Sequence, residues 1–375
     1  MADTLEALLD SLTVEGTLYE RLPDNAVHCF ACGHHCLIKE GRRGICKVRF
    51  NEGGVLRVPW GYVGALQCDP TEKKPFFHVY PGSDTLTFGM LGCDMHCVFC
   101  QNWVTSQALR DPASAMSGAY PEKISAAQIA ELGRRQGAKL VGSSYNEPLI
   151  TSEWAVAVFK EAAKFGMKGV YISNGNVTRE VLEFIRPHVI GYKIDLKTMS
   201  DKNYRGLGAV LQNVLDGIKL AKEMGLWVEV VTLTIPGFND DNAELMDAAR
   251  FIASVSPDIP WHVTAFHKDY KMLDPDDTTA AGLIRAGEIG QEAGLKFVYA
   301  GNLPGQVGDY ENTRCPHCQQ LLIARHGYVI LDYQLTDEGR CPKCGQSVPG
   351  VWPKRSEVRL GSLGNPYRRA PRRVR

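Results

Sequence analysis

The sequence lacks the features that assign a chain to the membrane, to export or to nucleic acid. Lysine and arginine together number 42, as do aspartate and glutamate, so no net charge favours nucleic acid or an anionic membrane surface. No apolar run approaches the roughly 20 residues of a membrane span. Residues 1–15 carry four acidic side chains and no basic one, the reverse of a signal peptide's basic start. We therefore expect a cytoplasmic protein with neither a membrane nor nucleic acid as its partner.

Disulfide bonds are a further expected absence, although the chain has 12 cysteines among its 375 residues. Cytoplasmic thiols stay reduced, and clustered cysteines there usually bind metals. The cysteines fall in groups of four, one, three and four along the chain. A hydrophobic share of 44% and a charged share of 22% suit a folded enzyme with a large core, of roughly two or three domains by length.

The group of three cysteines has the spacing C-x3-C-x2-C and consists of Cys93, Cys97 and Cys100. Three thiolates make an incomplete site, because closed zinc sites use four ligands and clusters held only by protein use four cysteines. A [4Fe–4S] cluster on three cysteines leaves one iron open for a substrate or a cofactor. The alternative is a structural zinc knuckle that borrows a fourth ligand, such as His96.

Each group of four cysteines can close a metal site alone. The C-terminal group forms two C-x2-C knuckles separated by 22 residues and predicts a zinc ribbon on Cys315, Cys318, Cys341 and Cys344. The N-terminal group is spaced C-x2-C-x3-C-x9-C and predicts either zinc or an auxiliary iron–sulfur cluster on Cys29, Cys32, Cys36 and Cys46. Both kinds of centre need four sulfurs, so the spacing leaves the choice open. The remaining Cys68 is interpreted as an ordinary buried thiol.

From residue 85 onward the hydrophobic pattern alternates between strands and helices. The predicted strands are Leu86–Leu91, Leu140–Ser144, Gly169–Ser173, Val189–Leu196, Trp227–Leu233, His262–Phe266 and Lys296–Tyr299. The predicted helices are Ala126–Gln136, Glu153–Phe165, Arg179–Ile185, Leu211–Met224, Asn242–Ser254 and Thr279–Glu292. Strict alternation implies a parallel sheet covered by helices, and about six units predict an α/β fold with a partial (β/α)6 barrel. In such barrels the chemistry lies at the C-terminal ends of the strands.

Polar side chains near these strand ends are the candidate site residues. Glu147 follows the second strand, and its carboxylate can accept hydrogen bonds from an ammonium group. Lys193 and Asp195 lie at the end of the fourth strand. His262 and His267, on the sixth strand and just after it, are candidate substrate-contacting or proton-transfer residues.

The three-cysteine motif, with Phe99 before its last cysteine, resembles the C-x3-C-x-aromatic-C signature of radical S-adenosylmethionine (SAM) enzymes. The resemblance implies that SAM binds the open iron through its amino and carboxylate groups. An electron from the cluster then splits the sulfonium and gives a 5′-deoxyadenosyl radical, which abstracts hydrogen from a substrate. The cofactors supply this chemistry, while the protein holds them and excludes solvent.

The same resemblance implies SAM-binding roles at the strand ends. Asn146 and Glu147 stand where family members often carry Gly-Gly-Glu-Pro, which binds the SAM amino group. Asn174, in Ser-Asn-Gly, resembles the Thr-Asn-Gly of glycyl-radical activating enzymes. Asp195, in Asp-Leu-Lys, resembles an aspartate near the SAM carboxylate in those enzymes, and Lys193 is expected to add positive charge there. The resemblance also implies an adenine pocket at Ile235, Gly301 and Asn302.

Longer matches extend the resemblance over about residues 20–350, to the radical SAM component of the AmmeMemoRadiSam system. They include Asp-Pro-Thr-Glu-Lys-Lys-Pro at 69–75, Cys-Gln-Asn-Trp at 100–103 and Phe-His-Lys-Asp-Tyr-Lys-Met at 266–272. Members are similar to pyruvate formate-lyase activating enzyme. The resemblance implies AMMECR- and Memo-domain partners and an electron donor such as flavodoxin or ferredoxin, and it names no substrate.

Four regions are expected from these patterns. They are an N-terminal helix with a four-cysteine module (1–82), the radical SAM partial barrel (83–305), a zinc-ribbon-like module (306–352) and a basic tail rich in proline and arginine (353–375). The expected function is radical hydrogen abstraction from a small molecule or a partner-bound group. One alternative is an activase that abstracts hydrogen from a glycine of another protein, and the other is a non-enzymatic multi-zinc scaffold.

Overall fold

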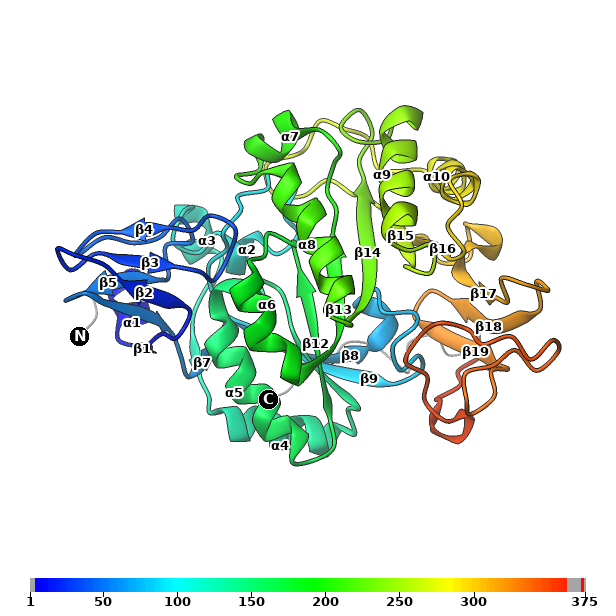
Figure 1. The fold of residues 1–375 in the computed structure, drawn as a ribbon, viewed down its shortest axis with the longest axis horizontal. Helices are drawn as coiled ribbons and strands as arrows, with labels where there is room; N and C mark the ends of the chain where they lie inside the picture. The colour runs from blue at the N-terminus through cyan, green and yellow to red at the C-terminus, as the bar shows by residue number, and fades with distance from the viewer. Residues whose placement is uncertain (1–3, 363–371, 374–375) are drawn as a thin grey trace.

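The computed structural model describes residues 4–362 and 372–373. Figure 1 shows a small β-rich module at the N-terminal end, a central body of strands and helices, and a second small β-rich module at the C-terminal end. Residues 363–371 and 374–375 of the expected tail lie outside the described residues. Within the described residues, every helix is too short or too polar to cross a membrane.

A nine-stranded sheet in the order β16-β15-β14-β13-β12-β11-β9-β8-β20 forms the central body. Its parallel strands are β9 (Asp84–Gly89), β11 (Leu140–Ser143), β12 (Lys168–Ser173), β13 (Val189–Asp195), β14 (Trp227–Thr234), β15 (Trp261–Ala265) and β16 (Val298–Gly301). Antiparallel neighbours extend the β9 edge, namely β8 (Ala65–Pro70) and β20 (Arg372–Arg373). The α/β fold with an open, partial barrel is thus confirmed, and each predicted strand is present.

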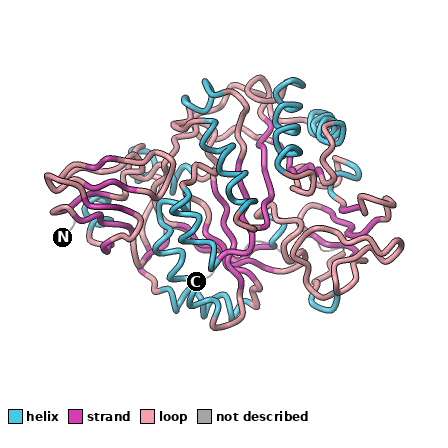
Figure 2. Tube along the Cα trace, viewed as in Figure 1, coloured by secondary structure: helices cyan, strands magenta, loops and turns pink. Residues whose placement is uncertain are grey.

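Helices connect the consecutive parallel strands and cover the sheet (Figure 2). They are α4 (Ala126–Gln136), α5 (Ser152–Ala163), α6 (Arg179–Ile185), α8 (Leu211–Glu223), α9 (Asn242–Val255) and α10 (Ala280–Glu292). Local sequence fixes the ends of α4, because Ser125 and Gln128 form a reciprocal capping box and Gly137 ends the helix with φ 70°. Shorter helices lie in the connections: α2 (Trp103–Ser106), α3 (Pro112–Met116) and α7 (Asp201–Gly206).

The N-terminal module begins with α1 (Leu5–Asp10) and contains two three-stranded sheets. One has the order β1-β6-β5, from β1 (Thr13–Glu15), β5 (Phe50–Glu52) and β6 (Val55–Pro59). The other has the order β2-β3-β4, from β2 (Tyr19–Arg21), β3 (Val27–Cys29) and β4 (Leu37–Ile38). The expected boundary at residue 82 does not match a change of fold, because β8 already pairs with β9 of the central sheet. A further small pair joins β7 (Tyr62–Val63) to β10 (Glu122–Lys123).

A buried ion pair fixes the N-terminal module to the central body. The guanidinium of Arg49 donates from Nη1 and Nη2 to the two carboxylate oxygens of Glu153 on α5, each at 2.8 Å. Nη1 also donates to the carbonyl of Ile150 at 3.1 Å, and the backbone N–H groups of Thr17 and Leu18 donate to Glu153 at 3.3 and 3.4 Å. The two side chains are only 1% and 6% exposed, so each charge depends on the other for its compensation.

The C-terminal module packs on the open β16 edge of the central sheet. It consists of β17 (Thr313–Arg314), β18 (Leu321–His326) and β19 (Val329–Tyr333) in that order. Its apolar side chains share one core with residues of the central body, namely Phe77, Phe297 and Tyr299. The module therefore covers an edge that the partial barrel would otherwise expose.

A chain of hydrogen bonds crosses this seam through His78. Its Nδ1 donates to the carbonyl of Pro349 at 2.7 Å, so its Nε2 accepts from the hydroxyl of Tyr299 at 2.7 Å. The Tyr299 oxygen accepts in turn from the hydroxyl of Thr313 at 2.8 Å. This order requires a neutral imidazole, and burial lowers the pKa of His78 to about 4.

Candidate active site

The three cysteines of the C-x3-C-x2-C motif lie in the loop that follows β9, at the C-terminal edge of the parallel strands. The backbone N–H of Met95 donates to Cys93 Sγ at 3.5 Å, and Cys100 Sγ lies 3.2 Å from the hydroxyl of Ser106. Burial raises the pKa of the Cys97 thiol to about 12. Such a buried thiol becomes a thiolate when a bound metal supplies the compensating positive charge.

Glu147 follows β11 and joins the end of that strand to the end of β12. Its Oε1 accepts from the backbone N–H of Leu149 at 3.1 Å and from the hydroxyl of Ser173 at 2.7 Å, and its Oε2 accepts from the N–H of Asn174 at 2.7 Å. Burial, and then the neighbouring Asp94 carboxylate, raises the pKa of Glu147 to about 8. A carboxylate has about four acceptor positions, so these three donors leave room for one more.

A second buried carboxylate, Asp94, comes from the cysteine loop itself. Its Oδ1 accepts from the side-chain amide of Asn174 at 2.7 Å, and its Oδ2 accepts from that of Asn176 at 2.9 Å. The neighbouring Asn146 uses its side-chain oxygen to accept from the N–H of Met90 at 3.1 Å. The cysteine loop is therefore bonded to both strand ends that the sequence associates with SAM.

The end of β13 carries two lysines on one aspartate. The ammonium groups of Lys193 and Lys197 both donate to Asp195, the latter at 3.3 Å. Burial lowers the pKa of Lys193. For Lys197 burial acts in the same direction, but Asp195 and then Cys97 outweigh it and raise the pKa. Lys197 is therefore a cation beside the cysteine loop.

The Ile-Pro-Gly loop after β14 also contacts the cysteine loop. Ile235 is fully buried, and its N–H donates to Asn239 Oδ1 at 2.7 Å. The side-chain amide of Asn239 donates to the carbonyl of Lys197 at 2.7 Å, which joins this loop to the end of β13. The ring of Phe238 meets Phe99 of the cysteine motif edge-on, with centroids 5.7 Å apart.

Gly301 and Asn302 lie at the C-terminal end of β16, as expected. Asn302 adopts a left-handed backbone with φ 69°, and its side chain donates to the carbonyl of Ala265 at the end of β15, at 3.2 Å. The hydroxyl of Tyr328 donates to Asn302 Oδ1 at 3.4 Å. Because Tyr328 lies at the tip of the β18–β19 hairpin, the C-terminal module reaches the same edge of the sheet as the cysteine loop.

The structure separates the two candidate histidines. His267 is exposed after β15, and its Nε2 accepts from the side-chain amide of Gln101, next to Cys100, at 3.0 Å. His262 is the second residue of β15, is 2% exposed, and donates from Nε2 to Glu229 at 2.7 Å. The expected position of His262 at the C-terminal strand end is wrong, because β15 begins at Trp261 and its early residues lie at the opposite end of the sheet.

Comparison with known proteins identifies the family. Residues 88–252 match the model of the radical SAM superfamily. The uncharacterized protein MJ0808 of Methanocaldococcus jannaschii is 38% identical over 339 residues, which cover 89% of this chain and 98% of that protein. The chain belongs to the radical SAM superfamily. Its members are enzymes, and membership implies an iron–sulfur cluster and SAM.

Solved structures resemble this radical SAM enzyme weakly. A domain of pyruvate-formate lyase-activating enzyme from Bacteroides vulgatus is 19% identical with a TM-score of 0.39, over 43% of this chain and 98% of that one. A radical SAM methyltransferase from Sphaerobacter thermophilus is 15% identical with a TM-score of 0.46, over 64% and 71%.

The three-cysteine loop fits the cluster that membership in the radical SAM superfamily implies. Its donors are three sulfurs from one short loop, and no fourth cysteine of that loop closes the set. Asp94 of this loop accepts hydrogen bonds from the side-chain amides of Asn174 and Asn176, which hold the loop against the end of β12.

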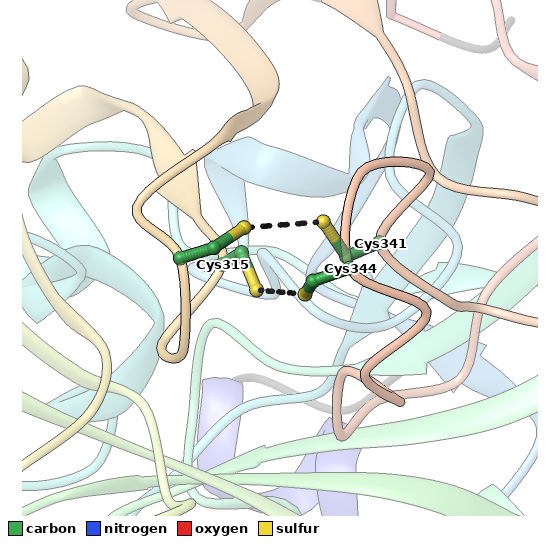
Figure 3. A group of neighbouring side chains, drawn as sticks. Cys315, Cys341 and Cys344 are labelled. Carbon is green, nitrogen blue, oxygen red and sulfur yellow. Dashed lines mark hydrogen bonds between the residues drawn. The ribbon is translucent and has the colours of Figure 1, made fainter.

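The C-terminal module of the radical SAM enzyme gathers a separate set of four cysteines. The sulfurs of Cys315, Cys318, Cys341 and Cys344 lie within 4.8 Å of one another. Figure 3 shows Cys315 facing Cys341 and Cys344 across a small gap. The Sγ–Sγ distances are 3.6 Å for Cys315–Cys344 and 3.7 Å for Cys318–Cys341. Tetrahedral zinc with Zn–S bonds of about 2.3 Å holds its sulfurs about 3.8 Å apart, so the set has the spacing of a single ion.

Several residues of the site were missed by reasoning from the sequence. Asp94 and Asn176, which join the cysteine loop to the end of β12, were not among the candidates. An acid directly after the first cysteine of a metal motif is a local signal that could have identified Asp94. No local signal identifies the Arg49–Glu153 pair, since its members are 104 residues apart.

Proposed function

We propose that Cys93, Cys97 and Cys100 hold a [4Fe–4S] cluster whose open iron binds SAM, and that the enzyme abstracts hydrogen from a small molecule or a partner-bound group. When bound, the cluster and SAM together supply an electron and a 5′-deoxyadenosyl radical. The observation that carries the proposal is the junction of the cysteine loop with the strand ends at Glu147 and Asn174, made through Asp94.

Glu147 is suited to the SAM amino group. Its carboxylate has one acceptor position left after its three internal hydrogen bonds. An ammonium group at that position would favour the ionised carboxylate and oppose the burial that raises the pKa of Glu147 to about 8. Asn174 gives its side-chain amide to Asp94, so we assign it to positioning the loop. Lys197 supplies positive charge beside the thiolates.

The adenine pocket is proposed at the remaining strand ends. Ile235 offers a buried apolar side chain beside the Phe238–Phe99 contact. Gly301 and Asn302 offer a backbone edge at the end of β16. The side-chain oxygen of Asn146 accepts a hydrogen bond from the N–H of Met90 and so positions the start of the cysteine loop. The backbone around Asn146 is proposed to contact SAM.

A small substrate is favoured over a glycine-bearing loop of another protein. The segment after β15 folds over the cysteine loop, because the N–H of Lys271 donates to the carbonyl of Val98 at 2.9 Å and Tyr270 stacks on Trp103 with centroids 5.2 Å apart. The tip of the C-terminal hairpin approaches from the β16 side at Asn302. Both segments restrict the space around the cysteine loop that a loop of another protein would have to enter. The proposed partners are flavodoxin or ferredoxin as electron donor and AMMECR- and Memo-domain proteins.

Anaerobic reconstitution with iron and sulfide, followed by dithionite and SAM, tests the proposal. We expect 5′-deoxyadenosine from the wild type and none from C97A. The matched control is C68A, whose cysteine lies on β8 outside the three metal-binding sets and whose replacement should leave the product unchanged. Equal product from C97A and the wild type would contradict the assignment. A colourless protein that holds zinc alone and cleaves no SAM would favour the multi-zinc scaffold.

A further inference from the structure

The four N-terminal cysteines are spaced differently from the four C-terminal ones. The C-terminal sulfurs all lie within 4.8 Å of one another. Among the residues that the structure describes, no other set of three or more cysteine, histidine or acidic ligand atoms meets this limit. In the N-terminal set and in the set of the radical SAM motif, no three sulfurs therefore all lie within 4.8 Å of one another.

The wider N-terminal set is nevertheless one group. The β3–β4 hairpin joins Cys29 to Cys36 through the hydrogen bond from Cys29 N–H to the Cys36 carbonyl, at 3.0 Å. Cys29, Cys32 and Cys46 are only 5–7% exposed. A Cβ on Gly44, two residues before Cys46, would lie 3.6 Å from Cys36 Sγ. The hairpin and the turn that carries Cys46 thus bring the four cysteines together in one mostly buried group.

Ligand spacing distinguishes a single ion from a cluster. Zinc holds four sulfurs about 3.8 Å apart, as in the C-terminal module. In a [4Fe–4S] cluster each cysteine binds a different iron, so the sulfurs lie farther apart. The radical SAM motif, for which membership implies an iron–sulfur cluster, has the wider spacing. We propose that Cys29, Cys32, Cys36 and Cys46 hold a second [4Fe–4S] cluster rather than zinc.

The N-terminal site is built against the radical SAM loop. His34, between Cys32 and Cys36, donates from Nε2 to the carbonyl of Asp94 at 3.1 Å. The N–H of Gly33 donates to the carbonyl of Asn176 at 2.8 Å, and Asn176 is itself bonded to the Asp94 carboxylate. Two short hydrogen-bonded paths therefore connect the N-terminal cysteines to the residue that follows Cys93.

The turn that carries Ile45 and Cys46 makes equally close contact with the radical SAM loop. A Cβ on Gly92 would lie 3.1 Å from the carbonyl of Cys46, so the residue before Cys93 packs directly on a ligand of the other set. Arg110 donates to the carbonyl of Ile45 at 2.6 Å and to that of Met95 at 2.7 Å, which clamps the two loops together. The arrangement places the two proposed clusters side by side.

With four protein ligands the N-terminal cluster has no open iron, so it transfers electrons and does not bind substrate. A reduced flavodoxin or ferredoxin loses one electron to this cluster, and the cluster passes that electron to the one on the radical SAM motif. No bond or proton is transferred in either step. Cys36 is the most exposed of its set, and the exposed apolar residues Leu37 (63%) and Ile45 (46%) flank the side from which a donor would approach.

Metal analysis of the C93A/C97A/C100A variant tests the proposal independently of the proposed catalytic function, because this variant lacks the catalytic ligands. After anaerobic reconstitution we expect about four irons per chain, with sulfide to match, and a reduced-cluster resonance that SAM does not change. Zinc should be about one per chain, from the C-terminal set. About two zincs and no iron would overturn the proposal.

Further measurements keep the test decisive if that variant fails to fold. The wild type should hold about eight irons and one zinc per chain, and about four irons with two zincs would refute the second cluster. The C315A/C341A control should lose zinc and keep its iron. In C29A/C32A, dithionite should still reduce the remaining cluster while reduction by flavodoxin is lost. Unchanged reduction by flavodoxin would overturn the electron path.

Discussion

The buried pair of Arg49 and Glu153 allows a prediction whose size follows from the structure. E153Q removes the negative charge and leaves the Arg49 guanidinium 1% exposed, with the Ile150 carbonyl at 3.1 Å among its remaining partners. Arg49 cannot escape by losing its proton, because arginine keeps its charge in proteins. Removing one partner of a buried pair costs about 3–5 kcal/mol, and we expect that loss in E153Q.

Urea unfolding under anaerobic conditions measures this loss. The matched control is E131Q on α4, whose carboxylate pairs with Arg134 and Arg135 at the surface. Exposed pairs contribute at most about 1 kcal/mol, so E131Q should unfold close to the wild type. The double variant R49M/E153L should recover most of the stability, because apolar side chains of similar volume replace both charges. Equal losses in E153Q and E131Q would refute the reasoning.

Three further predictions concern the cysteine loop, the seam and the C-terminal module. In D94N two buried amide donors lose their charged acceptor, so the free energy of unfolding should fall by about 1–3 kcal/mol, as measured by urea unfolding. SAM cleavage, measured as 5′-deoxyadenosine, should fall as well. Unchanged values would contradict the role of the Asp94 hydrogen bonds in holding the cysteine loop. The pKa of His78 is about 4 in the folded protein, whereas the ordinary value of 6.5 applies in the unfolded chain. Between pH 4 and pH 6.5 the unfolded chain therefore binds more protons than the folded protein. His78 should therefore destabilise the fold by about 2 kcal/mol as the pH falls from 7 to 5, and a flat urea midpoint would contradict its buried neutral state. C341S should release about one zinc per chain, read with a chromogenic chelator, and lower the melting temperature without loss of iron; retained zinc would show that the ion lies elsewhere.

Much of the fold follows from local patterns in the sequence. The strands and helices after residue 84 appear within a few residues of their predicted bounds, because hydrophobic periodicity and end signals act over short distances. The capping box at Ser125 and the left-handed Gly137 are examples. The cysteine motif and the strand-end positions of Glu147, Asn174 and Asn302 were predictable for the same reason, since each follows a strand directly.

The remaining features depend on contacts between distant residues. The role of His262 depends on Glu229, 33 residues away on the neighbouring strand, whose carboxylate accepts its hydrogen bond. The pairing of β8 with β9 across residue 82 is a property of the sheet and not of the β8 sequence. Lys193 and Lys197 stand two residues before and two residues after Asp195, and the path of the loop after β13 places Lys197 near the cysteines.

Electron paramagnetic resonance of the dithionite-reduced enzyme, recorded with and without SAM, shows whether SAM binds the open iron of a cluster on Cys93, Cys97 and Cys100. We expect SAM to change the signal of one cluster in the wild type and in C68A, and we expect no such change in C97A. A signal that SAM leaves unchanged in the fully reconstituted wild type would contradict SAM binding at that iron.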